Sequence, residues 1–308
     1  MAQTADTARS DMQRRTPVAA ALCGVVLASA AAAQDAPAPS VLAGVQTELG
    51  VTYDTNVTRA RLSSDILSDE FFSLQLSKDW IVPIAAQSRV TLTGVAGGDA
   101  FVHYSGLSRA FAEGQANIDY RTSGEFDAVT FGAFVRVGGD AYKSLLRSGY
   151  RLATGLTAQA ALTDRINLLG AVGYDERRAE SDVFSGRNTS VRLNLDYAAT
   201  DRDTLYLGAD YRRGDVVSSG RASLENIDTA KVLVPDDAFP GGDWFSYRFE
   251  ADTLVTTVGF NHGFGPKASI DASWRHAVSK PALSPSFPTT VPNRYIADQF
   301  TISFVLRF

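Results

Sequence analysis

The chain ends on the stretch Gln299-Phe-Thr-Ile-Ser-Phe-Val-Leu-Arg-Phe308, in which apolar and polar residues alternate. The apolar parity holds Phe300, Ile302, Phe304, Leu306 and Phe308. Side chains that alternate with a period of two point to opposite faces of a β-strand. The stretch therefore predicts a strand that has one apolar face and one polar face.

This ending, with its terminal aromatic residue, resembles the final strand of Gram-negative outer-membrane β-barrels. The resemblance implies a transmembrane antiparallel up-and-down barrel in the outer membrane of a Gram-negative bacterium. It also implies that the barrel-assembly machinery contacts Phe308 during insertion. A periplasmic or secreted all-β domain is the alternative fold.

The amino-terminal sequence predicts export. Basic residues at Met12-Gln-Arg-Arg15 precede the uncharged stretch 17–33, which ends in small residues. This pattern indicates a removable signal peptide over 1–33, with either Met1 or Met12 as the start. We expect a periplasmic linker at 34–42 and the barrel at 43–308. Cys23, the only cysteine, falls within the signal peptide, so no disulfide is expected.

About twelve alternating segments follow, which predicts an all-β barrel of about 12 strands. The segments are 45–54, 72–80, 89–98, 111–121, 126–137, 150–162, 166–175, 190–197, 205–212, 247–260, 268–278 and 295–308. In the tenth segment the apolar parity changes near Thr253, which suggests a β-bulge. Short and mostly longer connections alternate, as periplasmic turns and external loops do in outer-membrane barrels.

Aromatic residues fall near the strand ends, on the parity expected to face lipid. Amphipathic rings prefer the headgroup level of a membrane. The expected girdle residues are Tyr53, Trp80, Tyr120, Tyr150, Tyr174, Tyr197, Tyr211, Tyr247, Tyr295 and Phe308. Outer-membrane lipid and lipopolysaccharide are therefore expected partners.

The opposite parity predicts the pore lining, where charged side chains can face water. These residues are Glu48, Arg89, Glu113, Asn117, Arg136, Arg151, Gln159, Arg192, Asn194, Asp210, Arg212, Arg248, Glu250, Asp252, Asp271 and Arg275. Because both signs are interspersed, they predict either a cross-linked interior or a weakly selective channel for small hydrophilic solutes. The net charge of -5 makes nucleic-acid binding unfavourable.

The segment 213–246 is the longest expected loop, and loops of this length usually have a function or are disordered. A lid or a constriction is expected from Val232, Leu233, Asp236, Asp237, Phe239 and Trp244. A solvated surface loop is the alternative. The aspartates fit no known calcium-loop spacing, so neither a metal nor another cofactor is expected.

The sequence offers two alternatives to transport. The first strand, Leu49–Val57, resembles that of surface-lipoprotein assembly modifiers and exopolysaccharide-operon barrels. That resemblance implies a non-conducting docking or export accessory with an unknown periplasmic or surface partner. The motif His103-Tyr-Ser105 resembles part of the site of outer-membrane phospholipase, but Gly106 follows the serine where that family has asparagine. We therefore expect no catalytic residues and no enzymatic activity.

Overall fold

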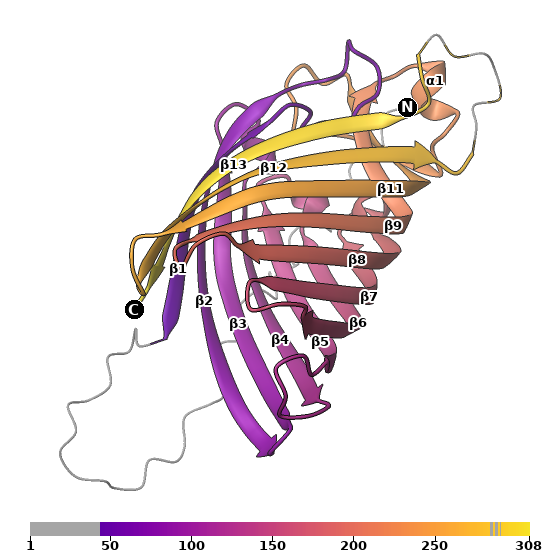
Figure 1. The fold of residues 1–308 in the computed structure, drawn as a ribbon. Helices are drawn as coiled ribbons and strands as arrows, with labels where there is room; N and C mark the ends of the chain where they lie inside the picture. The colour runs from indigo at the N-terminus through magenta and orange to yellow at the C-terminus, as the bar shows by residue number, and fades with distance from the viewer. Residues whose placement is uncertain (1–43, 284–285, 287–288, 290) are drawn as a thin grey trace, which may run out of the picture. The chain divides into compact units, whose positions relative to one another are not determined.

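The computed structural model describes residues 44–283, 286, 289 and 291–308, so the expected signal peptide and linker lie outside the described residues. The described chain forms an all-β, antiparallel up-and-down barrel of twelve strands (Figure 1). Its strands are β1 (Val45–Asp54), β2 (Asp69–Ala85), β3 (Ser88–Phe101), β4 (Arg109–Arg121), β5 (Thr130–Tyr142), β6 (Gly149–Ala161), β7 (Ile166–Ala179), β8 (Gly186–Ala198), β9 (Asp203–Arg221), β11 (Trp244–Gly263), β12 (Ala268–Pro281) and β13 (Tyr295–Arg307).

The barrel closes because its first and last strands pair. β1 and β13 are antiparallel from Gln46 opposite Arg307 to Asp54 opposite Gln299. β9 pairs directly with β11, so every barrel strand has two neighbours. An extra short strand, β10 (Val232–Pro235), pairs with β11 beyond the end of β12. The helix α1 is Leu224–Ile227, and 3-10 turns occupy Ser105–Leu107, Leu145–Arg147 and Asp182–Phe184.

The two ends of the barrel differ. One end, here called the turn end, carries the connections 86–87, 122–129, 162–165, 199–202 and 264–267. The other, the loop end, carries 55–68, 102–108, 143–148, 180–185, 222–243 and 282–294. Several predicted boundaries differ from the structure. β5 begins at Thr130 rather than 126, β2 ends at Ala85 rather than 80, and the longest loop is 222–243 rather than 213–246, because β9 and β11 stay paired up to Arg221 and Trp244.

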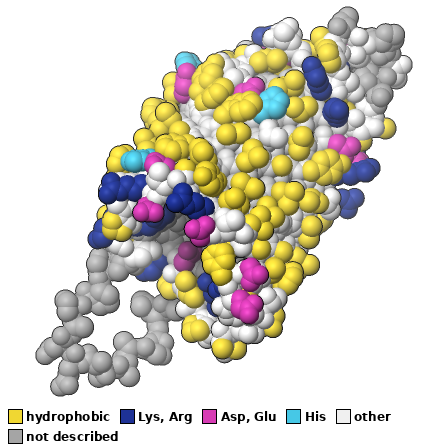
Figure 2. Space-filling view, viewed as in Figure 1, with side chains coloured by type: hydrophobic (Ala, Val, Ile, Leu, Met, Phe, Trp, Pro, Cys, Tyr) yellow, Lys and Arg dark blue, Asp and Glu magenta, His cyan; other side chains and the backbone are white. Residues whose placement is uncertain are grey.

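The outer face of the barrel is apolar, and the inner face is polar. On β1, Leu49, Val51 and Tyr53 are exposed, whereas Thr52 and Asp54 on the opposite parity are buried. Hydrophobic side chains cover much of the face in view (Figure 2). Soluble proteins rarely expose apolar patches larger than a few hundred Å². A continuous apolar belt of this kind fits the hydrocarbon layer of a membrane. Among the described residues, no helix has the length and apolar character needed to cross a membrane.

Candidate functional site

The lumen brings together most of the residues predicted to line a pore. Those on strands other than β11 share the inward parity. They are Glu48, Arg89, Glu113, Asn117, Arg136, Arg151, Gln159, Arg192, Asn194, Asp210, Arg212, Asp271 and Arg275. Several pair with opposite charges across neighbouring strands, as Arg89 does with Asp119 at 3.1 Å. The interior is therefore partly cross-linked by ion pairs.

The β11 residues Arg248, Glu250 and Asp252 do not line the lumen, which corrects the sequence prediction. They share the parity of Leu254, which is exposed on the outer face. The pairing of β11 with β9 and β12 has no register shift, so the bulge expected near Thr253 is absent. The apolar residues of β11 change parity because the surroundings of the strand change along its length. Beyond the membrane-facing part, the outward side meets water and the inward side packs against other apolar side chains.

Arginines from five strands gather in the middle of the lumen. They are Arg136 (β5), Arg151 (β6), Arg192 (β8), Arg212 (β9) and Arg275 (β12), which line two cavities of about 240 and 460 Å³. We call these five residues the arginine cluster. The sequence prediction of an evenly mixed interior missed this grouping, because the five residues are distant in the chain and meet only when the ring of strands closes.

The arginine cluster is only partly neutralised. Asp175, Asp196 and Asp210 line the same cavities. Asp210 accepts hydrogen bonds from two arginines, Arg192 at 3.2 Å and Arg212 at 2.6 Å. In contrast, Arg136 donates to the side-chain oxygen of Gln115 at 2.6 Å. The lining of these cavities therefore carries an excess of positive charge.

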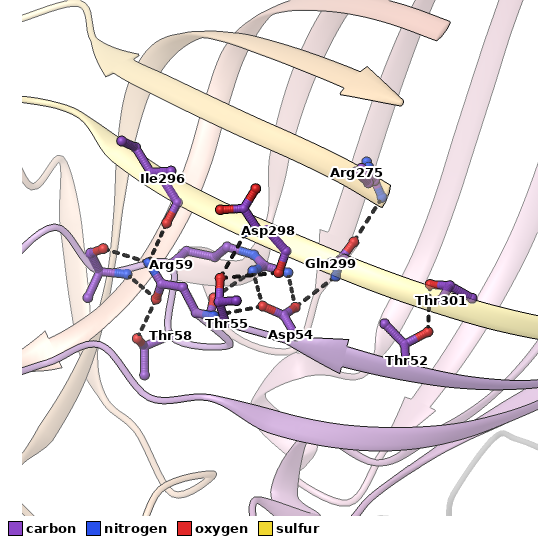
Figure 3. Close-up of polar contacts among 12 residues, drawn as sticks. Thr52, Asp54, Thr55, Thr58, Arg59, Arg275, Ile296, Asp298, Gln299 and Thr301 are labelled. Atoms are coloured by element: carbon purple, nitrogen blue, oxygen red, sulfur yellow. Dashed lines mark hydrogen bonds and ion pairs between the residues drawn. The ribbon is translucent and has the colours of Figure 1, made fainter. Parts of the chain in front are cut away.

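A buried network at the seam of the barrel fixes a further arginine (Figure 3). Asp54, at the end of β1, accepts bonds from Arg59 at 2.8 and 2.6 Å and from Gln299 at 2.7 Å. Arg59 has a φ of 54°, a left-handed conformation that is uncommon without glycine. Asn56 donates to the carbonyls of Ala60 and Ile296, both at 2.7 Å. These bonds hold loop 55–68 against β13 and offset the cost of the conformation of Arg59.

Loop 222–243 crosses the mouth of the barrel at the loop end. It joins β9 to β11, and its Ala238, Phe239 and the adjoining Trp244 pack on Leu107, which lies between β3 and β4. The connection between β9 and β11 and the connection between β3 and β4 lie on opposite sides of the ring of strands. At Gly106, an added Cβ would lie 2.5 Å from the Ala238 Cα, so only glycine permits this contact. The loop therefore spans the opening as a cap.

Polar contacts tie the cap to other loops. Arg147, in loop 143–148, forms an ion pair with Asp236 at 2.6 Å. Burial lowers the pKa of the Arg147 guanidinium, and the adjacent Asp236 carboxylate opposes this shift. The Arg61 side chain, which is fully buried, contacts Glu225 at 3.1 Å. Asn226 donates to Asp65 at 3.1 Å.

The residues predicted to form a lid divide into two groups. Asp236, Phe239 and Trp244 are buried within the cap, and Asp237, although exposed, accepts a bond from Ser144. Val232 and Leu233 instead lie on β10 and pair with β11, and the Leu233 side chain is 44% exposed. Leu233 therefore lies on the outer surface of the loop, whereas Asp236, Phe239 and Trp244 face its interior.

The aromatic girdle contains fewer residues than predicted. Tyr53, Trp80, Tyr120, Tyr150, Tyr197, Tyr211 and Phe308 are exposed on the outer face, and Tyr174 is half-buried. Tyr247 and Tyr295 are each only 3% exposed, so their assignment to the girdle was wrong. They point inward and pack with Phe249, whose ring centroid lies 4.6 Å from that of Tyr295. Together with Ala251, these rings form a second apolar cluster inside the barrel.

In the His103-Tyr-Ser105 motif, the histidine and the serine bond to different partners. His103 Nδ1 lies 2.8 Å from the Asp69 carboxylate, but Ser105 Oγ accepts a bond from Lys143 Nζ at 2.8 Å. Asp69 also accepts bonds from the backbone N–H groups of His103 and Tyr104. Asp69 and Glu70 lie close enough to His103 to form a potential metal-ligand group. Through these hydrogen bonds, Asp69 fixes the conformation of loop 102–108.

Comparison with known proteins relates the fold to outer-membrane barrels. An outer-membrane channel from Pseudomonas putida F1 is 12% identical, with a TM-score of 0.51 over 89% of this chain and 100% of that one. The KdgM porin is 8% identical, with a TM-score of 0.43 over 85% of this chain and 99% of that one. The NanC porin is also 8% identical, with a TM-score of 0.43 over 85% and 100%. At these identities the likeness concerns the fold.

No protein-family model matches the sequence. No curated protein matches it either.

Proposed function

We propose that the protein is a passive outer-membrane channel for small hydrophilic solutes, with its external mouth closed at rest by loop 222–243. The observation that carries this proposal is the pair of cavities in the lumen, about 240 and 460 Å³, whose linings include many charged and polar side chains. Charges at membrane depth are stable where they face water or a partner. At about twelve strands, a barrel is intermediate between side-chain-filled barrels of about eight strands and open porins of about sixteen.

The lumen also suggests which solutes pass most easily. Ion pairs neutralise much of the lining, which supports weak ionic selectivity. The arginine cluster adds an excess of positive charge where the two cavities meet, because Arg192 and Arg212 line both. We therefore propose a modest preference for anions over cations.

A non-conducting docking or export accessory is the second candidate, and the cap favours it. Phe239 and Trp244 pack on Leu107, so loop 222–243 is held across the mouth. Purified protein in a planar lipid bilayer separates the two functions. Discrete conductance steps support the channel, whereas silence in both the native protein and a variant without the cap supports the accessory.

We expect the loop end to face the outside of the cell, as long loops do in outer-membrane barrels. A cysteine at Leu224, whose side chain is 78% exposed, should react with a membrane-impermeant thiol reagent on intact cells. A cysteine at Asp164, in the turn 162–165, should react only after the outer membrane is permeabilised. Labelling of Asp164→Cys on intact cells would reverse the orientation.

We expect Arg136→Gln combined with Arg275→Gln to lower the permeability of anions relative to cations severalfold. These arginines bond to glutamine oxygens rather than to carboxylates, at 2.6 and 3.5 Å, so their removal leaves no acid unpaired. The reversal potential under a salt gradient measures the change, in the variant without the cap and at low ionic strength to limit screening. Arg202→Gln, at an exposed turn-end position, is the control and should cause no shift. An unchanged reversal potential in the double variant would contradict the preference.

A further inference from the structure

A groove of about 740 Å³ lies on the outer face of the barrel and is larger than either cavity of the lumen. It lies where the loop-end parts of β7, β8, β9 and β11 meet. Glu176, Arg187, Arg213 and Glu250 are among its lining residues. They share the outward parity of their strands, so the groove opens to the side of the barrel and is separate from the lumen.

The height of the groove relative to the lipid face follows from the strand pairing. Its residues Thr189 and Arg213 are paired on β8 and β9. Two positions further toward the membrane, the lipid-facing residues Val191 and Tyr211 form the next outward pair. Two residues of a strand span about 7 Å. The groove therefore begins one outward-facing residue pair, or about 7 Å, above the apolar belt. This is the level of the headgroups of the adjacent leaflet.

Positive charge exceeds negative charge on this surface. The outward cations are Arg178, Arg187, Arg213, Lys231 and Arg248, and the acids are Glu176, Asp215 and Glu250. The acids already have partners: Glu176 pairs with Arg178, and Lys231 lies 3.5 Å from Asp215 and 3.0 Å from Glu250. The guanidinium groups of Arg187 and Arg213 are exposed, and within the described part of the chain they make no hydrogen bond or ion pair.

We propose that this groove binds the phosphorylated sugar headgroup of a glycolipid in the external leaflet, with Arg187 and Arg213 as the phosphate ligands. A guanidinium matches the geometry of a phosphate through two parallel N–H···O bonds. The apolar residues directly below, including Val191, Leu193 and Tyr211, offer a surface for the acyl chains of the same molecule. Position, charge and the adjoining apolar face together select a lipid rather than a free anion. The proposal is independent of conductance, because a silent barrel would present the same face.

The test is a titration of the purified full-length barrel in detergent with bisphosphorylated lipid A, with bound lipid counted by native mass spectrometry. Arg187→Gln combined with Arg213→Gln should weaken binding at least about tenfold, since both charge-assisted bonds to the phosphate are lost. Arg202→Gln combined with Lys267→Gln removes the same charge at the turn end and should bind as the native protein does. Heat-modifiability on electrophoresis shows that each variant is folded.

Three results would overturn the proposal. Native affinity in the Arg187→Gln/Arg213→Gln variant would exclude these ligands. Equal binding of dephosphorylated lipid A would exclude phosphate recognition. Displacement of lipid A by inorganic phosphate at millimolar concentration would assign the groove to a free anion. Arg187→Lys combined with Arg213→Lys keeps the charge but loses the paired bonds, and its binding should fall between those of the native protein and the glutamine variant.

Discussion

Single-channel conductance should rise severalfold when residues 222–243 are replaced by an Asn-Gly turn. The replacement removes the segment that crosses the mouth, including Phe239, which is 4% exposed and packs on Trp244. It leaves the barrel intact, because β9 and β11 pair as far as Arg221 and Trp244, and an Asn-Gly pair closes such a hairpin in a type I′ turn. The variant should also admit larger solutes than the native protein.

A point substitution tests the same cap without shortening the chain. Truncating a buried phenylalanine costs about 3–5 kcal/mol, so Phe239→Ala should loosen the cap and produce frequent transitions between conductance levels. Leu233→Ala is the matched control, because Leu233 belongs to the same loop but is 44% exposed. If the native and loop-replaced proteins are both silent, side chains fill the lumen, and the docking or export accessory becomes the better function.

The period-two pattern predicted the membrane-facing part of the barrel well, for a physical reason. Where one face of a strand meets lipid and the other meets water, apolar and polar residues must alternate, as they do at Phe300, Thr301 and Ile302. β13 pairs with β1 and β12 in the register that this alternation requires. A shift of one residue would turn the polar side chains into lipid, so the sequence specifies the parity strongly.

The same reasoning failed where the strands leave the membrane. On β11, Tyr247 and Phe249 point inward into an apolar cluster, whereas Arg248 points outward toward water. The apolar face is thus inward above the membrane and outward within it, while the strand itself continues without a bulge. A β-bulge would produce the same sequence pattern as this change of environment, so the hydrophobicity pattern alone cannot distinguish the two. For the same reason, Tyr295 matched a girdle position by its pattern although it is buried.

The candidate sites depend on contacts that the sequence pattern does not contain. The arginine cluster requires strands as distant as β5 and β12 to face one lumen. The cap requires Ala238 to meet Gly106, more than a hundred residues earlier in the chain. Composition could identify charged inward positions and an apolar loop. It could not show that the positive charges gather or that the loop reaches the opposite side of the mouth.

Leu193→Arg should destabilise the barrel far more than Asn194→Arg. Leu193 is 54% exposed on the outer face and lies between Gly170 and Ala209 of the neighbouring strands. An arginine on the lipid side at the bilayer midplane costs about 2–4 kcal/mol. Asn194 instead lines the cavity of about 460 Å³ in the lumen, where a guanidinium can keep its water.

The free energy of unfolding, measured by denaturant titration in lipid vesicles, should show this difference between adjacent residues. The two variants add the same side chain to the same strand, so β-propensity and net charge are matched. Asn194→Arg adds a cation near Arg192 and Arg212, and we expect a smaller loss that shrinks as salt screens the repulsion. The loss in Leu193→Arg should be largely independent of salt, because it arises from desolvation in hydrocarbon. Equal losses in the two variants would mean that β8 does not present Leu193 to lipid, and with it the inward assignment of the arginine cluster would fail.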